Sequence, residues 1–460
     1  RLKEHLIEKW GENVVVPISN FNTLKLRSLI KDISKLYDIP FMEVNKVTRV
    51  MMDEATPLAK KKHGIKAGVY VPTFEEVMAY SDSLKRFLDK YPDVKTHVEA
   101  LHGQIRSVSR HAGGVVIGED LDSRMPLINS GGVIQTPWSE GQNVRHLEPM
   151  GFIKFDILGL TTVEMIEQSI INILKKQGVA DPQPADVKEF YDEYLHPDQL
   201  DLADQEVWEN IFHKGKFAGI FQFSQDGAQE FCKRAKPNNI IDLSAITSIY
   251  RPGPLSAAVD KNYISSKKNP SKIKYIHPII EEETKDTYGF LIFQEQIALL
   301  AHKLGKNISL DEGNLLRKLL TKKGSTKGYD QKKEIKNKFI QGCLEKSISE
   351  FDADKLWATF EYFSGYGFNK SHAVSYAIDS YYCAWLMTYF EEEWLCAYLE
   401  AMSNNPTKRA KAFGEIKKLG YKVAPLDVNY ADKSWTILEG KKFMPSFLSC
   451  KGVGTAAIDE

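Results

Sequence analysis

The stretch GFIKFDILGL, residues 151–160, decides the prediction of the fold. Side chains alternate between the two faces of a β-strand, so its apolar residues are expected together on one face, which is then buried. These apolar residues are Ile153, Phe155 and Ile157. Lys154 and Asp156 are expected side by side on the opposite face. A well-marked helical pattern follows at 161–178, so the sequence predicts that a small mixed α/β region ends just before this helix.

Outward from this strand, the pattern predicts an α+β protein with more than one domain. Residues 1–37 indicate a helix, a short strand at VVVP and a second helix, and residues 38–110 indicate mostly polar helices. A glycine-led strand is expected from His111, and residues 180–445 are expected to be largely helical. A chain of 460 residues is too long for one ordinary core, so we expect about two to four domains.

The composition is that of a folded globular chain, with 43% hydrophobic and 27% charged residues. There is no run of about eighteen uncharged apolar residues, so a transmembrane helix is not predicted. Five scattered cysteines without a CxxC pair argue against a disulfide framework or a structural zinc site and indicate a reducing cytoplasm. The 61 basic residues equal the 61 acidic residues, so the charge of the whole chain gives no support to a nucleic-acid partner.

Lys154 and Asp156 form the first candidate site. A carboxylate beside an ammonium at the end of a short strand can hold a divalent cation while the lysine meets a phosphate. The alternative is a solvent-facing ion pair on a half-exposed strand, because such pairs are common on protein surfaces. The spacing of the two residues alone favours this alternative.

The second candidate site is the basic segment 315–338, in which nine basic residues stand against Asp330 and Glu334. The basic residues are Arg317, Lys318, Lys322, Lys323, Lys327, Lys332, Lys333, Lys336 and Lys338. A cluster of this kind can neutralise the phosphates of a nucleotide or of a nucleic-acid backbone. A solvated helix face followed by a lysine-rich loop explains the same pattern, and both interpretations stay open.

The third candidate site is the stretch SGYGFNKSHAVSYA at 364–377. Its polar residues before an apolar helix are Asn369, Lys370, Ser371 and His372. Ser371 can simply be the N-cap of that helix, and His372 has no second metal ligand at a recognisable spacing. In RPGP at 251–254 a rigid turn presents Arg251, and a structural turn is the default interpretation. The signatures of a P-loop, a serine hydrolase, a zinc peptidase and a zinc finger do not occur in the sequence.

Taken together, these segments resemble the bacterial replicative DNA polymerases of the C family, the α subunits of the polymerase III holoenzyme. The matching runs follow the family's order and extend from about residue 20 to residue 390. They are FNTLKLRSLIKDI, RHAGGVVI, GFIKFDILGL, FAGIFQF, YRPGPL, TYGFLIFQEQI, LLRKLLTKK and SGYGFNKSHAVSYA. Several of these runs are long, which makes the resemblance more specific than any short motif.

The resemblance implies a small palm with a polymerase-β-like nucleotidyltransferase fold, a helical thumb and large, mostly helical fingers. The implied boundaries are residues 1–33 and 111–160 for the palm, residues 34–110 for the thumb and residues 161–440 for the fingers. Residues 441–460, which contain KGVG, resemble the start of a helix-hairpin-helix region.

The resemblance also implies roles for individual residues. Asp156 matches one of three catalytic aspartates that hold two Mg²⁺ ions, and Lys154 matches a neighbouring lysine that faces the triphosphate. The other implied dNTP contacts are Arg317, Lys318, Lys322, Arg251, Asn369, Lys370, Ser371, His372, Arg27 and Lys31. The implied DNA contacts are Lys323, Lys327, Lys60, Lys61 and Lys62.

The implied activity is transfer of dNMP to a primer 3′-hydroxyl in the cytoplasm, with primer–template DNA and dNTPs as partners and no membrane. A sliding clamp and other replisome subunits are implied as partners of regions outside this chain. The family's other two aspartates lie in a PDxDxDF-type strand ahead of the segment that resembles residues 1–33, and no such strand occurs in this sequence. The chain by itself is therefore expected to be inactive.

Two other functions stay open. A non-catalytic DNA-binding or scaffold subunit that kept the fold would bind DNA in a salt-dependent way without incorporating nucleotides. The presence of both Lys154 and Asp156 argues against this function, since a scaffold needs neither residue. A metal-dependent nuclease has less support, because clustered carboxylates or histidines do not occur in the sequence.

Overall fold

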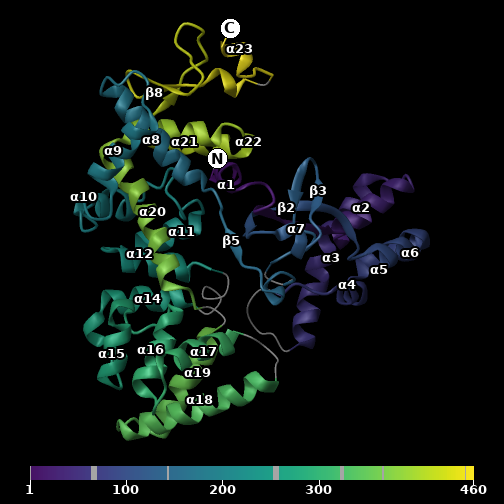
Figure 1. Cartoon of the computed structure of the whole chain (residues 1–460), viewed down its shortest axis with the longest axis vertical. Coiled ribbons are helices and arrows are strands. Elements are labelled where there is room, and N and C mark those ends of the chain that lie inside the picture. Colours follow the sequence, from purple (N-terminus) through teal and green to yellow (C-terminus); the bar gives the residue numbers. More distant parts are fainter. Residues whose placement is uncertain are drawn as a thin grey trace. The chain divides into compact units, whose positions relative to one another are not determined.

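The computed structural model contains two compact units, residues 1–160 (unit 1) and residues 161–460 (unit 2) (Figure 1). Unit 1 combines a three-stranded sheet with a group of helices, and unit 2 is built mainly from helices. The described residues are 2–63, 70–141, 145–251, 258–321, 326–364, 367–450 and 452–459.

An antiparallel sheet with the strand order β1-β2-β5 forms one half of unit 1. Its strands are β1 (Val15–Thr23), β2 (Ile105–Ile117) and β5 (Lys154–Asp156). β-Branched residues favour strands, and the valines of VVVP pair with the valine-rich end of β2. At the edge of the sheet, Lys154 pairs with Val116 and Asp156 pairs with Gly114. The register therefore places the charged pair of β5 beside the glycines of β2.

The prediction that the apolar face of β5 is buried is wrong. Ile153 is 68% exposed and Phe155 is 44% exposed. Directly paired residues of an antiparallel sheet point to the same face, and the small core beside this sheet contains Val116, the partner of Lys154. The core therefore lies on the lysine's side of β5. The alternation along the strand is correct, but it does not say which of the two faces is covered.

The helices of unit 1 pack around a second core. They are α2 (Leu26–Leu36), α3 (Phe41–Lys62), α4 (Phe74–Tyr80), α5 (Asp82–Lys90) and α6 (Pro92–Leu101). In α2 the buried residues Leu26, Leu29, Ile30 and Ile33 repeat at the spacing of an amphipathic helix. The helical prediction for 38–110 is confirmed in the described residues, except that β2 already begins at Ile105. The other elements of this unit are α1 (Leu2–Trp10), α7 (Leu121–Arg124), β3 (Ile128–Ser130) and β4 (Val133–Gln135).

Unit 2 begins with α8 (Thr161–Lys176), as the sequence predicts. Gly178 follows with a φ of +98°, the left-handed conformation that ends many helices. The next helices are α9 (Pro184–Phe190), α10 (Gln205–Val207), α11 (Asp226–Ala235), α12 (Ile240–Ile249), α14 (Val259–Lys268) and α15 (Pro278–Thr284). They are followed by α16 (Gln294–Leu304), α17 (Leu310–Thr321), α18 (Thr326–Glu345) and α19 (Glu350–Ser364).

The largest core of the chain lies in unit 2, where Trp208, Trp394 and Tyr381 are fully buried. It includes residues of the last long helices, α20 (Lys370–Tyr389), α21 (Glu391–Met402) and α22 (Pro406–Lys418). A small sheet with the order β6-β8-β7 and a short helix follow. These elements are β6 (Lys422–Val423), β7 (Thr436–Leu438), β8 (Lys442–Met444) and α23 (Ala456–Asp459).

The α+β class is confirmed, because the described residues are mostly helical and contain small sheets in both units. The more specific assignment to a polymerase-β-like palm, a thumb and fingers stays a prediction. Among the residues that the structure describes, no helix combines the length and the apolar character needed to cross a membrane.

Candidate functional site

The charged pair of β5 is the centre of a first candidate site, which lies in unit 1. The ammonium Nζ of Lys154 lies 3.2 Å from Oδ1 of Asp156. The lysine side chain is 20% exposed and the aspartate side chain is 60% exposed, so the carboxylate is open to a ligand. Nζ of Lys154 also lies 3.2 Å from Nε2 of His111 on β2. Three polar side chains from two strands therefore meet at the edge of the sheet.

The backbone of β2 fixes the ring of His111. Its Nδ1 accepts hydrogen bonds from the N–H groups of Gly113 at 3.2 Å and Gly114 at 2.8 Å. Burial of the ring, together with the positive charge of Lys154, lowers the pKa of His111 from its ordinary value. The imidazole is therefore mainly uncharged at neutral pH and adds no second positive charge beside Lys154. Because Nδ1 accepts from the two backbone N–H groups, the ring proton is on Nε2, which lies beside the ammonium without accepting a hydrogen bond from it.

Gly114 permits this close arrangement. A Cβ atom at this position would lie 2.9 Å from Cε of Lys154 and 3.1 Å from Nδ1 of His111, and both distances are shorter than a normal contact. Because Gly114 is also the strand partner of Asp156, any side chain here would push the lysine away from the aspartate. The close approach of the Lys154 and His111 side chains explains why a glycine stands at this position.

A further cation, Lys3, lies near the aspartate. Nζ of Lys3 on α1 donates to the carbonyl oxygen of Ala112 at 2.7 Å. Burial and the charge of Arg110 lower the pKa of Lys3, and the charge of Asp156 opposes this shift. Lys3 is thus within electrostatic reach of both Arg110 and Asp156. Sequence reasoning missed Lys3, because 109 residues separate it from the residue that it contacts.

The side chains around Asp156 supply only some of the ligands that a metal ion needs. The carboxylate oxygens of Asp156 are of the type that Mg²⁺ prefers. The described ranges of the chain contain no group of three or more histidine, cysteine, aspartate or glutamate side chains that could hold a metal ion. The described residues therefore do not fit a two-ion site by themselves, and Asp156 fits the role of one ligand among several.

A second candidate site lies in unit 2, where the loop before α20 packs on the start of α16. The N–H of Gln294 donates to the carbonyl oxygen of Phe368 at 2.9 Å. The carboxylate of Glu295 accepts two hydrogen bonds at 2.9 Å, one from the Asn369 side chain and one from the N–H of Lys370. These contacts join segments that are more than seventy residues apart, so the loop has a fixed place on the helix.

Asn369, and not Ser371 as the sequence suggested, is the N-cap of α20. Its Oδ1 accepts from the N–H of His372 at 2.9 Å and from the Ser371 hydroxyl at 2.7 Å. The ring of His372 packs against Phe368 and Tyr376, with ring centroids 5.2 Å and 4.1 Å apart. The serine hydroxyl is therefore engaged in the cap, and the histidine is held by its aromatic neighbours.

The same loop gathers two arginines from distant parts of the sequence. Nη1 of Arg317 on α17 donates to the side-chain oxygen of Gln294 at 2.9 Å. The amide of Gln294 in turn donates to the carbonyl oxygen of Gly367 at 2.9 Å. The guanidinium of Arg251 lies 3.9 Å from the ring centroid of Phe368, which is a cation–π contact. The structure thus brings together six of the unit 2 residues that the sequence singled out, namely Arg251, Arg317, Asn369, Lys370, Ser371 and His372.

Two family models match the chain. The Bacterial DNA polymerase III alpha NTPase domain matches residues 1–159, and the Bacterial DNA polymerase III alpha subunit finger domain matches residues 183–347. The chain belongs to the family of bacterial DNA polymerase III α subunits. The Asp156 cluster lies in the first matched segment of this polymerase III α chain, and Arg251 and Arg317 lie in the second.

Curated polymerase III α subunits resemble the chain over nearly its whole length. The DNA polymerase III subunit alpha of Treponema pallidum is 30% identical over 453 residues, which cover 98% of this chain and 36% of that protein. The subunit of Borreliella burgdorferi is 31% identical and covers 95% of this chain, and 35% of its own length is matched. The subunit of Aquifex aeolicus is 28% identical, with 98% of this chain and 38% of that protein covered. The chain thus spans about a third of the length of the curated relatives that it matches.

Other residues that the polymerase III resemblance singled out lie apart from the Asp156 cluster. Arg27 and Lys31 are on α2, which follows the end of β1 that pairs with Ile105. Ile105 is nine residues along β2 from Gly114, or about 30 Å at about 3.3 Å per residue. Nζ of Lys31 donates to the side-chain oxygen of Asn45 at 2.9 Å. The predicted DNA contacts at the last turn of α3 are Lys60, Lys61 and Lys62.

The basic segment 315–338 of this polymerase III α chain is partly neutralised by carboxylates of neighbouring helices. The ion pairs are Lys332–Glu361 at 2.7 Å, Lys336–Asp354 at 2.8 Å and Lys338–Glu312 at 2.7 Å. Lys318 is exposed on α17, the helix that carries Arg317. The predicted site residues Lys322 and Lys323 and the side chain of Lys327 lie outside the described residues, as does the PGP part of the RPGP turn.

Proposed function

We propose that this chain carries part of the active site of a replicative DNA polymerase, which transfers dNMP to the 3′-hydroxyl of a primer. The observation that carries this proposal is the pairing of Asp156 with Lys154 on β5, inside the segment that matches the NTPase-domain model. An exposed carboxylate beside a partly buried ammonium suits a metal ligand that stands next to a phosphate-binding lysine.

Two Mg²⁺ ions, when bound at the complete site, would neutralise phosphate charge and activate the primer hydroxyl. We infer that Asp156 is one of their ligands. Because the described residues offer no group of three carboxylates or other ligands, the remaining ligands would come from other parts of the polymerase. The 460-residue chain alone is therefore expected not to extend a primer.

The cations around Asp156 would bind and orient the triphosphate. Negative charge spreads over the phosphate oxygens during an in-line displacement, and positive side chains in fixed positions lower the energy of that charge. Nζ of Lys154 is paired with Asp156 at 3.2 Å, and Nζ of Lys3 donates to the backbone of β2. Their positions are thus set before a substrate binds, which reduces the entropy lost on binding.

The arginines and the Asn369 loop of unit 2 would form further dNTP contacts. A guanidinium can donate two parallel hydrogen bonds to a phosphate. Arg317 is oriented by Gln294, and Arg251 is oriented by the ring of Phe368. Contacts with a sliding clamp and with other replisome subunits are proposed for regions outside this chain.

The alternative function is a non-catalytic DNA-binding or scaffold subunit that derives from the polymerase. Primer extension by the complete polymerase in the presence of Mg²⁺ separates the two functions. Template-directed incorporation supports the proposal. Salt-dependent DNA binding without any incorporation by the complete protein supports the scaffold instead.

Replacement of Gly114 by Ala is expected to slow nucleotide incorporation by the complete polymerase by about tenfold to a hundredfold, because a displacement of about 1 Å can have this effect. The added Cβ would lie 2.9 Å from Cε of Lys154, whose flexible end moves away from Asp156. Incorporation rates at saturating dNTP measure the effect. Gly159→Ala is the matched control, since no atom lies within 4 Å of a Cβ there. Equal rates for the two variants would contradict the role given to Gly114.

Arg317→Ala is expected to raise the dissociation constant for dNTP by about tenfold to a hundredfold, since a charge-assisted hydrogen bond contributes about 1.5–3 kcal/mol. Single-turnover incorporation at varied dNTP concentrations measures this constant. Lys333→Ala is the control, because Lys333 is an exposed basic residue of the same segment. Arg317→Lys keeps the charge but loses the planar fork, so an intermediate value is expected. An unchanged constant for Arg317→Ala would remove Arg317 from the dNTP contacts.

A further inference from the structure

One face of α22 borders two neighbouring cavities in unit 2. The cavities have volumes of about 660 Å³ and about 480 Å³, and Phe217, Lys411 and Glu415 line both of them. Lys408 lines the first cavity and Lys418 lines the second. These α22 residues follow one another at intervals of three or four positions, so they share one face of the helix. The two cavities therefore form a row along the helix.

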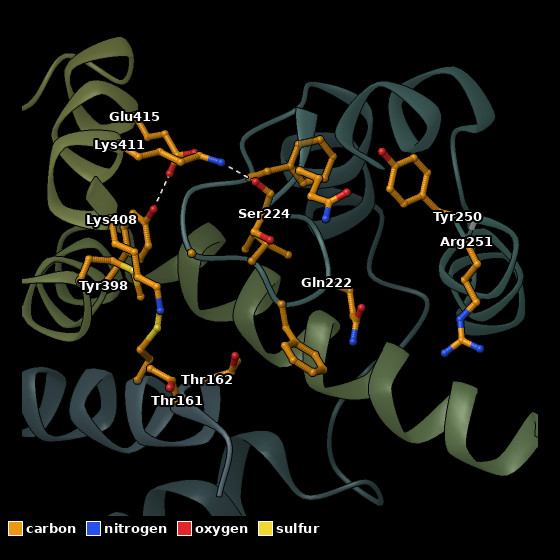
Figure 2. Close-up of a pocket in the computed structure, with 17 residues that line it drawn as sticks. Thr161, Thr162, Gln222, Ser224, Tyr250, Arg251, Tyr398, Lys408, Lys411 and Glu415 are labelled. Atoms are coloured by element: carbon orange, nitrogen blue, oxygen red, sulfur yellow. Dashed lines mark hydrogen bonds and ion pairs between the residues drawn. The ribbon is translucent and has the colours of Figure 1, made fainter. Parts of the chain in front are cut away.

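Lys411 and Glu415, which line both cavities, are held in place by contacts with neighbouring residues. Nζ of Lys411 donates to the carbonyl oxygen of Ser224 (Figure 2). Glu415 accepts a hydrogen bond from the Tyr398 hydroxyl at 2.6 Å and lies 3.8 Å from Nζ of Lys411. Glu415 and Lys411 are thus partly paired with each other, and Lys408 and Lys418 add positive charge at the two ends of the row.

Lysines line the whole row, and the acidic residues of its lining are Glu415 and Asp226. Figure 2 shows Lys408 on one side of the first cavity and Arg251 on the other side. Lys408 and Lys418 are ten positions apart, so with Lys411 between them they span about 15 Å of helix. A ligand with several negative charges at intervals along a chain would contact all three lysines, whereas a single small anion would contact one or two.

Part of the wall of the first cavity is apolar and includes Met165, Phe217 and Phe221. Gly219 has a φ of +75°, and a Cβ there would lie 2.9 Å from Cε of Met165 and 3.0 Å from Cδ2 of Tyr398. The chain segment that follows presents Phe221 to the cavity, with its ring 5.0 Å from the ring of Tyr376. Flat apolar walls of this kind suit an aromatic ring of a ligand.

We propose that this face of α22 and its two cavities bind a short stretch of single-stranded DNA. The phosphates would lie along Lys408, Lys411 and Lys418, and the bases would enter the cavities. Single-strand sites in general combine a cationic groove for the backbone with aromatic surfaces for the bases. The identification of this strand as the unpaired part of the template rests on the proposed polymerase function.

The test is binding of a fluorescently labelled oligothymidine of about twelve nucleotides to the 460-residue chain, measured by anisotropy at several salt concentrations. Lys408→Ala/Lys418→Ala is compared with Arg409→Ala/Lys417→Ala. The second variant removes the same charge from other sides of the same helix, at positions that line neither cavity. We expect the first variant to lower the slope of log affinity against log salt by about 1.4, since each lost phosphate contact contributes about 0.7.

The control variant is expected to bind within about twofold of the unaltered chain. Phe221→Ala is expected to weaken binding by about tenfold with an unchanged salt slope, because it removes an apolar surface and no charge. Equal losses of affinity in Lys408→Ala/Lys418→Ala and in Arg409→Ala/Lys417→Ala would overturn the site. No loss of affinity in either double variant would also overturn it. Thymidine monophosphate that binds as tightly as the oligonucleotide would also overturn it, in favour of a mononucleotide pocket.

Failure of this inference can be distinguished from failure of the proposed function. Primer extension by the complete polymerase is measured for Lys408→Ala/Lys418→Ala on templates with short and long single-stranded overhangs. A loss of template affinity that occurs only with long overhangs supports the inference. Equal affinity for both templates overturns it even when polymerase activity is present. Single-strand binding by the chain without activity of the complete protein overturns the proposed function alone.

Discussion

A complete polymerase that carries Asp156→Asn is expected to extend a primer about 10²–10³-fold more slowly than the unaltered enzyme, the usual cost of losing one fixed electrostatic partner of the reacting groups. Asparagine keeps the size of the side chain and removes its charge. Lys154 then stands 3.2 Å from a neutral amide, and the cations around it have no carboxylate partner on β5. The rate is measured at saturating dNTP and Mg²⁺.

The control for this variant is Asp53→Asn, at an exposed position on α3. Because the Asp156 side chain is 60% exposed, its replacement should change the free energy of unfolding by no more than about 0.5 kcal/mol. Affinity for primer–template DNA should also stay the same. A variant that folds and binds DNA but does not incorporate nucleotides supports the assigned role. A rate equal to that of Asp53→Asn would show that Asp156 is not a ligand of the reacting centre.

The sequence predicts local periodicity well, because periodicity depends on neighbouring residues. The helix that begins at Thr161 occurs where the pattern placed it. The strand predicted at VVVP also occurs, but it extends to Thr23 and is longer than predicted. The burial of β5 was predicted wrongly, since it depends on which face the rest of the sheet covers. Exposure of Phe155 follows from the pairing of Lys154 with Val116, and pairing is a long-range property.

The candidate sites show the same division between local and distant contacts. The resemblance placed Asp156 and Lys154 together, and their separation of two residues along a strand is enough to explain the contact. The supports of these residues come from elsewhere in the chain. His111 reaches Lys154 across 43 residues, and Glu295 reaches Asn369 across 74 residues. Neither His111 nor Glu295 belongs to a recognisable motif for its contact, so only the folded structure shows these contacts.

The stability of unit 2 is expected to depend strongly on one buried ion pair, Asp242–Lys267. Asp242 on α12 is 1% exposed, and its Oδ2 lies 2.8 Å from Nζ of Lys267 on α14. The hydroxyls of Tyr288 and Tyr263 donate to its Oδ1 at 3.0 Å and 3.3 Å, and the N–H of Asn238 donates to Oδ2 at 3.1 Å. Burial and the charge of this carboxylate raise the pKa of both tyrosines. The side-chain amide of Asn239 also donates to Oδ2 at 3.3 Å, so one carboxylate satisfies donors from five other residues.

Asp242→Ala is therefore expected to lower the free energy of unfolding by about 3–5 kcal/mol, because it leaves the buried Lys267 ammonium without a charged partner and with only the Tyr288 hydroxyl, at 3.4 Å, as an acceptor. Denaturant unfolding followed by tryptophan fluorescence measures the change, since Trp208 and Trp394 lie in the core of the same unit. Asp192→Ala breaks the exposed pair with Lys188 and should cost at most about 1 kcal/mol.

The double variant Asp242→Leu/Lys267→Met separates the two contributions to this loss. If the unpaired ammonium is the main cost, removal of both charges should restore more than about half of the stability that Asp242→Ala loses. The remaining loss would come from the tyrosine hydroxyls and the Asn238 N–H, which keep no acceptor in an apolar site. A double variant as unstable as Asp242→Ala would instead assign the stability to these neutral hydrogen bonds, with the lysine charge contributing little.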